Sequence, residues 1–239
     1  MISIVIPTYN EEKEIAATIK QFSSLDIPHE IIVSDTASTD GTIAAAKATG
    51  ATILLSPAGV RKGVAAARNR GGNAARGEFI VFLDSSTIIP DPNSFFQKIL
   101  AAFANDPKLL AISTRVRVEP ALRQSGDEPV CWINDSFFWV MNNIFGVGMA
   151  AGKFQMVRAS AFHEVHGFNE NLFAAEDLDF FGRLAKIGRT RIIWSLSVFH
   201  SGRRFHQLGA WRTMFRWIKN TISVWLFKKP ADKAWETVR

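Results

Sequence analysis

The run Phe79–Leu83, followed by Asp84, constrains the fold of this chain more than any other feature. Five consecutive apolar residues predict a strand buried on both faces, as in the centre of a parallel sheet that helices cover. Asp84 then lies at the carboxyl end of that strand, the edge at which open α/β sheets bind ligands. A carboxylate followed by small hydroxyl residues at this edge predicts a site for a metal or a sugar. The alternative is that Asp84 only opens a turn toward Asp91 and Pro92.

The first ninety residues repeat one pattern of a strand, a polar or acidic turn and a helix. Short apolar runs predict strands over 2–6, 30–34, 52–55 and 79–83. Capping and closing residues between these runs predict a helix that begins at Asn10, one over 38–50 and one over 63–75. Such repeats imply right-handed βαβ connections and a parallel sheet flanked by helices.

The second half of the chain gives signals of unequal strength. Asp91 and Pro92 are typical of a helix start, and the apolar spacing after them predicts one buried face. The remaining pattern predicts a strand over 109–118, a loop over 120–129, a strand end and a short helix within 156–166, a helix over 176–188, and strands over 191–194 and around Val198 up to His200. The aromatic, glycine-punctuated segment 132–152 gives no clear assignment.

Composition sets the class of protein. The 239 residues are 47% hydrophobic and 21% charged, and no Gly/Ser/Pro-rich linker divides them, so we expect one globular domain. A net charge of +6 favours anionic partners such as nucleotide phosphates or anionic lipid. The single Cys131 fits a reducing compartment. The first residues lack signal-peptide features and no run reaches 18 apolar residues, so we expect a cytoplasmic protein.

Four stretches together resemble the family 2 glycosyltransferases, which have the GT-A fold. They are IVIPTYNE at 4–11, VSDTASTDGT at 33–42, ARNRG at 67–71 with GEFIVFLD at 77–84, and EDLD at 176–179 with RL at 183–184. The resemblance implies a Rossmann-like, mostly parallel sheet flanked by helices. It also implies an enzyme that transfers a sugar from a nucleotide diphosphate donor with inversion, assisted by Mg²⁺ or Mn²⁺.

The resemblance places a nucleotide site at the ends of the first strands. It implies that Pro7, Tyr9 and Glu11 line the nucleoside pocket, and that Asp35 accepts a hydrogen bond from the base. Arg68 would approach the nucleotide, where a guanidinium grips phosphate or base; a solvated helix face is the alternative. Asp40 belongs to the same motif, but its position predicts a helix cap.

One departure from the family concerns the metal. Family members usually carry Asp-x-Asp where this chain has Asp84-Ser85-Ser86, so a weaker hydroxyl ligand replaces the second acid. We predict a metal held by Asp84, the donor diphosphate and His200, because a late histidine completes the metal site in some GT-A enzymes. Arg203 and Arg204 instead offer cations that neutralise the leaving diphosphate.

The acidic segment at 176–179 predicts the catalytic group. Asp177 stands at the start of a helix whose positive end favours ionised carboxylates, so we expect a charged general base. Glu176 is expected to hydrogen-bond the acceptor or a loop, and Asp179 to pair with Arg183 one helical turn later. The alternative is that all these acids merely stabilise the helix start.

The C-terminal segment predicts an amphipathic helix over 211–229. Its apolar residues form a stripe at helical spacing: Trp211, Met214, Phe215, Ile218, Ile222, Trp225 and Leu226. Cations surround it: Arg212, Arg216, Lys219, Lys228 and Lys229. Such a helix can lie on the anionic inner face of a membrane. There it would bring the site to a lipid-linked acceptor, as in cell-envelope glycan synthesis. It can equally pack on the enzyme body or on a second subunit of a homodimer.

The sequence therefore predicts a catalytic domain over 1–205, divided into a nucleotide-binding half (1–90) and an acceptor-binding half (91–205), and a helical segment over 206–239. The leading function is an inverting glycosyltransferase, with no nucleic-acid partner. One alternative, favoured by Ser86, is a nucleotide-sugar-binding protein without catalysis. The other, a nucleotidyltransferase, lacks its glycine- and lysine-rich phosphate loop after the first strand. The sugar, the base and the acceptor are not readable from the sequence.

Overall fold

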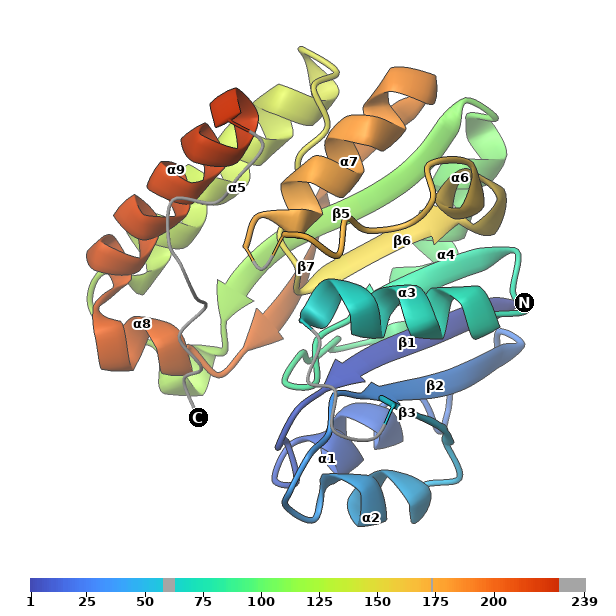
Figure 1. Ribbon diagram of the computed structural model, residues 1–239. Coiled ribbons are helices and arrows are strands. Elements are labelled where there is room, and N and C mark those ends of the chain that lie inside the picture. Colours follow the sequence, from blue (N-terminus) through green and yellow to red (C-terminus); the bar gives the residue numbers. More distant parts are fainter. Residues whose placement is uncertain (58–62, 173, 228–239) are drawn as a thin grey trace.

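A computed structural model describes residues 1–57, 63–172 and 174–227 of the chain, with side chains through Val224 (Figure 1). Its centre is a seven-stranded sheet in the order β3-β2-β1-β4-β6-β5-β7. The strands are β1 Ile2–Thr8, β2 His29–Asp35, β3 Thr52–Leu55, β4 Phe79–Leu83, β5 Leu109–Val118, β6 Phe154–Arg158 and β7 Arg189–His200. The predicted fold class, a mostly parallel sheet flanked by helices, is confirmed.

Helices cover both faces of the sheet because its central strands are apolar on both sides (Figure 1). The described helices are α1 Ile15–Lys20, α2 Thr42–Lys47, α3 Val64–Ala74, α4 Pro92–Asn105, α5 Asp127–Asn143, α6 Ala159–Glu164, α7 Glu176–Ile187, α8 Arg203–Leu208, α9 Ala210–Phe227 and the 3-10 turn η1 Pro120–Leu122. Side chains of α1 and α4 pack with Ile4 and Val81 on one face. Those of α3, α6 and α7 pack with Val5 and Phe82 on the other.

The strand order places a ligand site at one edge of the sheet. The chain runs outward from β1 to β3 and then returns to β4 on the other side of β1, so β1 and β4 flank a topological switch point. β6 is antiparallel to β4 and to β5, whereas β5 and β7 run parallel to each other. The carboxyl ends of β1, β2, β4, β5 and β7 therefore meet the amino end of β6 at the same edge.

Several local predictions are confirmed. Asp91 caps α4 by accepting a hydrogen bond from the Ser94 backbone N–H, and Pro92 occupies the first turn. β5 has the predicted bounds of 109–118. The helix at 176–187 ends before Gly188, as its spacing indicated.

Other local predictions are wrong. Asn10 does not cap a helix: its backbone is in the left-handed region with φ 52°, its side chain contacts Thr39, and α1 begins only at Ile15. The expected loop at 120–129 contains η1 and the first turn of α5, and α5 also accounts for the unassigned segment 132–152 as far as Asn143. The two strands expected near 191–194 and Val198 are one strand, β7, in which residues 194–196 bulge out of register with β5.

Helices α8 and α9 lie beyond β7, where α9 packs against α5 (Figure 1). The predicted stripe is divided between two faces of α9, because Met214 is buried against the body while other members are 45–63% exposed: Trp211, Phe215, Ile218 and Ile222. Lys228 and Lys229, and the side chains of Trp225 and Leu226, lie outside the described residues. Throughout the described chain, no helix is both long enough and apolar enough to cross a membrane.

Candidate active site

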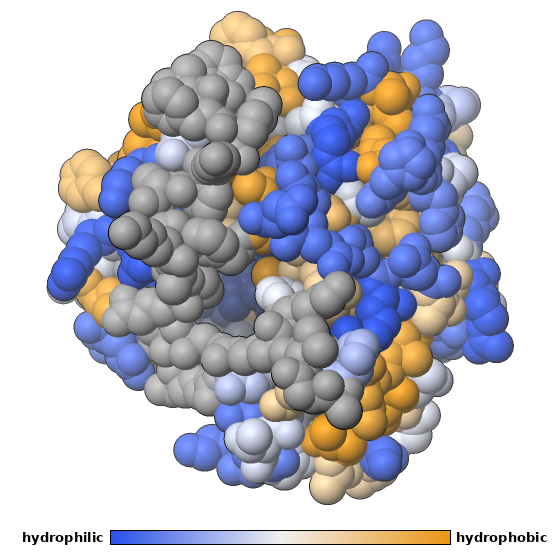
Figure 2. All heavy atoms as spheres, in the orientation of Figure 1, coloured by the Kyte–Doolittle hydropathy of each residue, from blue (hydrophilic) through white to orange (hydrophobic). Residues whose placement is uncertain are grey.

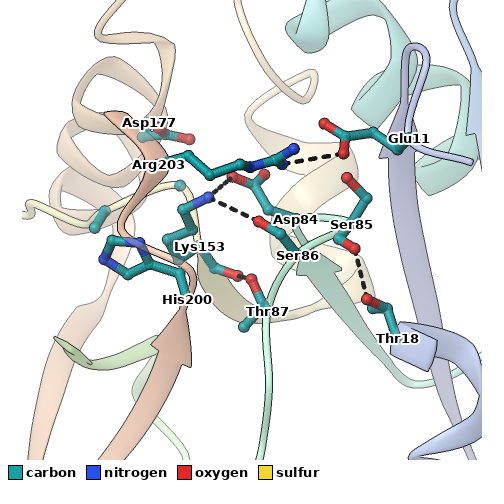
Figure 3. Close-up of polar contacts among 12 residues, drawn as sticks. Glu11, Thr18, Asp84, Ser85, Ser86, Thr87, Lys153, Asp177, His200 and Arg203 are labelled. Atoms are coloured by element: carbon teal, nitrogen blue, oxygen red, sulfur yellow. Dashed lines mark hydrogen bonds and ion pairs between the residues drawn. The ribbon is translucent and has the colours of Figure 1, made fainter. Parts of the chain in front are cut away.

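The turn after β4 presents Asp84 at the switch point, as the sequence predicts (Figure 3). This turn is held on two sides. The Thr18 hydroxyl of α1 donates to the Ser85 carbonyl at 2.5 Å, and the Thr87 hydroxyl donates to the Lys153 carbonyl at 3.2 Å. Since both anchors come from other elements, the turn is positioned by tertiary contacts and not by its own sequence alone.

Lys153 supplies a cation to this turn. Its Nζ lies 3.1 Å from Asp84 Oδ2 and 3.5 Å from Ser86 Oγ (Figure 3). Burial would raise the pKa of Asp84, but Lys153 and Arg68 outweigh it and hold the pKa below its ordinary value. Asp84 is therefore ionised at neutral pH. Lys153 was not predicted from the sequence; the signal that marks it is its position directly before β6, opposite Asp84 in the antiparallel pair.

Arg68 binds the acids of the site together. Its side chain on α3 is only 3% exposed, and its Nη1 donates to Glu176 at 2.9 Å and to Asp177 at 2.6 Å. Its Nη2 donates to Asp84 at 3.3 Å and to the Gly152 carbonyl at 3.1 Å. Burial alone would lower the pKa of Arg68, but the three carboxylates raise it. The guanidinium of Arg68 is thus enclosed by acids, and its contact with a nucleotide stays a prediction.

Asp177 lies in the first turn of α7, beside Glu176, with Oδ1 also accepting from Gln155 Nε2 at 3.0 Å. Burial raises the pKa of Asp177 to about 8; the charge of Arg68 opposes this rise and that of Glu176 adds to it. The expectation of a carboxylate fully ionised at neutral pH is therefore wrong, because the helix-end argument omitted burial. A pKa near 8 suits a group that accepts a proton near neutral pH.

Two further residues shape the surroundings of Asp177. Gln155, fully buried on β6, donates to Asp177 and leaves its Oε1 without a described partner. A side chain at Gly152 would place its Cβ 2.6 Å from Asp177 Oδ2 and 2.8 Å from Arg68 Nη2, so only glycine lets the backbone approach this closely. Gly152 ends the segment 132–152 that the sequence left unassigned, and Gln155 lies between that segment and the strand end predicted within 156–166.

The predicted nucleoside pocket centres on Asp35, at the end of β2. Its carboxylate is buried and accepts hydrogen bonds from the Thr8 hydroxyl at 3.1 Å and from the Ser38 N–H at 2.8 Å. These contacts tie the ends of β1 and β2 together. Pro7 lies buried beside them in β1, and Tyr9 follows in the turn. Contact of these side chains with a base stays a prediction.

Glu11 and Arg203 join the two halves of the molecule at this edge. Arg203 Nη2 lies 3.1 Å from Glu11 Oε2, although 192 residues separate them in the chain (Figure 3). Arg203 begins α8 next to Arg204, so both basic residues stand where the sequence placed them, after His200. Asp40 accepts from the Thr42 and Glu12 backbone N–H groups, but the N-cap of α2 is Gly41, so Asp40 lies one residue before the cap position that was predicted for it.

His200 ends β7 near Lys153 (Figure 3). Its Nδ1 accepts a hydrogen bond from the Gly202 N–H at 3.1 Å. Burial and the charge of Lys153 lower the pKa of His200 to about 3, so the ring is neutral at pH 7. A neutral ring with Nδ1 as acceptor carries its proton on Nε2. His200 thus shapes the turn to α8, and its role as a metal ligand stays a prediction.

Whether these residues fit a divalent ion depends on Asp84 and Ser86. Among the described residues, no three His, Cys, Asp or Glu side chains converge as metal ligands do. Asp84 and Ser86 offer two oxygen atoms to one cation, and Lys153 now contacts both. They fit Mg²⁺ or Mn²⁺ if the ion takes its further oxygen ligands from a donor diphosphate and replaces Lys153 at Asp84.

The sequence profile of glycosyl transferase family 2 matches residues 3–165, more than half of the chain. The chain belongs to this family. The match covers the switch point, Asp84 and Arg68, and ends before Asp177. The predicted family and enzyme class are confirmed.

Curated relatives match a shorter stretch. Glucosyl-3-phosphoglycerate synthases of Mycobacterium tuberculosis and Mycolicibacterium paratuberculosis are 39% and 38% identical over 98 residues. Each match covers 38% of this chain and 30% of the relative. The aligned stretch thus spans about a third of the length of these relatives.

Solved structures extend the likeness of fold over nearly the whole chain. A mannosyltransferase of Pyrobaculum calidifontis, in complex with GDP-Man and Mn²⁺, is 21% identical with a TM-score of 0.70 over 90% of this chain and 60% of its own. The glucosyl-3-phosphoglycerate synthase of M. tuberculosis, in complex with Mn²⁺, UDP-glucose and glycerol 3-phosphate, is 22% identical with a TM-score of 0.60 over 93% of this chain and 79% of its own. Both hold the classes of ligand predicted here, a divalent ion and a nucleotide sugar.

Proposed function

We propose that this protein transfers a sugar from a nucleotide diphosphate donor to an acceptor hydroxyl with inversion. The observation that carries the proposal is the cluster in which Arg68 bridges Asp84 and Asp177. One of these carboxylates is ionised and the other has a raised pKa, so a single buried network holds a charge-binding group and a proton acceptor. Membership of the family supports the same reaction class.

Asp177 acts as the general base. As the acceptor oxygen attacks the anomeric carbon in line, Asp177 takes the hydroxyl proton, and the bond to the leaving diphosphate breaks. Arg68 and Gln155 fix the orientation of the carboxylate, since both donate to its Oδ1. Glu176, the other predicted catalytic acid, engages Arg68 at 2.9 Å and acts as a positioning residue.

The leaving diphosphate is stabilised at the turn after β4. Lys153, Arg203 and Arg204 provide cations around Asp84 and Glu11. A divalent ion bound with the donor would add a Lewis acid at this position, held by Asp84 and Ser86. The nucleoside lies against Pro7, Tyr9 and Asp35 in this proposal.

The acceptor reaches the site from a membrane surface. Trp211, Phe215 and Ile218 are exposed on α9, Arg212 lies beside them, and this composition suits an anionic bilayer interface. Apolar patches interrupt the hydrophilic surface on the side of the molecule where α5 and α9 lie (Figure 2). Flotation with anionic and with neutral liposomes tests this proposal. Protein that stays unbound in both but sediments as a homodimer would show that the face serves a second subunit.

A thermal-shift screen with UDP, GDP, CDP and dTDP, each with and without Mn²⁺, tests the donor site. We expect one base to stand out, because a ligand that binds only the folded state raises its stability by mass action. Donor hydrolysis then separates the alternatives: a binding protein without catalysis binds but releases no sugar, and a nucleotidyltransferase releases pyrophosphate from a nucleoside triphosphate. The absence of any nucleotide effect would refute the proposal.

A further inference from the structure

A hollow of about 270 Å³ lies where the first turn of α5 faces β5 and β7. We call it the arginine hollow, and its lining residues are Arg115, Arg117, Arg123, Glu128, Ser197 and Phe199. Two of the three arginines have acid partners. Arg117 pairs with Glu128 at 2.9 Å and Asp135 at 3.3 Å, and Arg123 pairs with Glu128 at 2.8 Å.

Arg115 differs from its neighbours. Within the described chain its guanidinium has no ion pair, and its Nε is buried without a hydrogen-bond partner. Burial and the charge of Arg117 lower the pKa of Arg115 by more than Asp135 and Glu128 raise it, which means that its charged form is under-stabilised there. A buried polar group without a partner is costly, so an anion that reached Arg115 would relieve an existing penalty.

A second hollow, of about 370 Å³, lies farther along α5. We call it the tryptophan hollow, and it is lined by Ser136, Trp139, Val140 and Trp194. Almost all of its lining is apolar, and the two indole rings meet edge to face with centroids 6.5 Å apart. Near it on α5, Ile133 and Phe137 are more than 40% exposed, so an apolar surface continues beside this hollow.

The two hollows meet at one pair of residues. The Arg115 guanidinium lies over the Trp194 ring, 5.2 Å from its centroid. The bulge in β7 creates this contact, because residues 194–196 leave the register between β5 and β7 and Ser197 resumes it opposite Arg115. The arginine hollow lies toward His200, the end of β7 at the active-site edge, and the tryptophan hollow lies away from that edge.

We propose that these hollows together bind an amphipathic phosphate, with the anionic head at Arg115 and the apolar chain against Trp139 and Trp194. Charge complementarity selects an anionic head, and the apolar second hollow selects a chain over a free phosphate or a sugar phosphate. This inference rests on the proposed function in one respect: a lipid held by its phosphate at the active-site end of β7 can present a hydroxyl of its head group to Asp177 as the acceptor.

Isothermal titration calorimetry on the full chain tests the proposal with three probes below their micelle concentrations: n-decyl phosphate, methyl phosphate and n-decyl glucoside. We expect decyl phosphate to bind at least about ten-fold more tightly than either other probe, because only it combines a charged head with a chain to bury. If decyl glucoside binds as tightly as decyl phosphate, the site is only a non-specific apolar surface. If methyl phosphate binds as tightly as decyl phosphate, the site is only an anion pocket. Either result overturns the proposal.

Variants test which hollow binds the anionic head and which binds the apolar chain of the ligand. Arg115→Met removes the guanidinium and should weaken decyl phosphate about ten-fold without affecting decyl glucoside. Arg189→Met is the control, because Arg189 is an exposed arginine that begins the neighbouring strand β7 and pairs with Asp106 outside both hollows, so the change should alter neither affinity. Ser136→Trp should fill the tryptophan hollow, abolishing the gain from the decyl chain while methyl phosphate still binds. Wild-type binding of decyl phosphate by both Arg115→Met and Ser136→Trp would overturn the proposal.

A parallel thermal shift with the nucleoside diphosphates separates this proposal from the proposed function. If the protein responds to a nucleotide but does not distinguish decyl phosphate from decyl glucoside, the proposed donor site is supported and the lipid site is refuted. If it binds decyl phosphate with the expected preference but responds to no nucleotide, the lipid site is supported and the proposed donor site is refuted.

Discussion

Arg68, which is buried, and Arg115, which is half-buried, show how differently this molecule uses the same side chain. Arg68 is surrounded by three carboxylates, which raise its pKa against the effect of burial. Arg115 has no ion pair among the described residues, and burial with a neighbouring arginine lowers its pKa. The charge of Arg68 is balanced inside the protein, where it organises the catalytic acids, whereas Arg115 is the arginine proposed to bind an external anion. An arginine withdrawn from solvent has a structural role when carboxylates of the same chain pair with it. It is a candidate for ligand recognition when no such carboxylate does.

The largest difference between the two arginines should appear in stability. Arg68→Met leaves its acids buried without their cation and should lower the free energy of unfolding by about 3–5 kcal/mol. Arg115→Met removes a charge that no carboxylate of the described residues pairs and should change this free energy by less than about 0.5 kcal/mol. Urea denaturation followed by circular dichroism measures both. Equal losses for the two variants would mean that Arg115 is also a structural ion-pair residue.

The next effect concerns catalysis within the Arg68 cluster. Asp177→Asn keeps the shape of the side chain but cannot take the acceptor proton, so kcat should fall about 10²-fold or more with nucleotide affinity almost unchanged. Asp179→Asn is the control, because Asp179 pairs with Arg183 at 2.8 Å outside the cluster. Steady-state kinetics and calorimetry make the comparison. Turnover near wild type in Asp177→Asn would place the base elsewhere.

A smaller effect is expected at the nucleoside end. Asp35→Ala removes the acceptor of the Thr8 and Ser38 hydrogen bonds and should weaken nucleoside diphosphate binding by about 1–3 kcal/mol. Because this change leaves Arg68 and Arg115 untouched, decyl phosphate binding should stay as in the wild type. Calorimetry with the nucleotide that stabilises the protein tests it; an unaltered Kd removes Asp35 from the binding site.

The smallest effect concerns the metal. Ser86→Asp restores a second acid beside Asp84 and should lower the Mn²⁺ concentration for half-maximal activity about three-fold, since a carboxylate is a stronger ligand than a hydroxyl. The gain is modest because Lys153 competes for the same oxygen atoms. A Mn²⁺ titration of the transfer rate measures it. Full wild-type activity in excess EDTA would assign the charge-stabilising role to Lys153 and Arg203 instead.

The sequence predicts the parts of this site that depend on local pattern. The apolar run before Asp84, the cap at Asp91 and the acidic start of α7 are each visible within a few residues. Lys153 and Gln155 could not be assigned a role in this way, because both act through the insertion of antiparallel β6 beside β4, a pairing between segments far apart in the chain.

The pKa of Asp177 was mispredicted for a related reason. The helix start argued for an ionised carboxylate, but burial of the group raises its pKa, and the charges of Glu176 and Asp84 add to this rise although Arg68 and Gln155 oppose it. The bulge that brings Arg115 over Trp194 is likewise set by the register between β5 and β7 and not by either strand alone. Local sequence therefore identifies candidate groups, while long-range packing decides their protonation and their partners.

The pH dependence of kcat/KM tests the central claim, that burial within the Arg68 cluster sets Asp177 as a base with a pKa of about 8. Below this pKa the carboxyl group holds a proton and cannot accept another, so activity requires the ionised form present above it. We predict that kcat/KM rises about ten-fold per pH unit below pH 8 and levels off above it. A profile that is flat from pH 6 to 9, in a protein that stays folded over this range, would contradict the account.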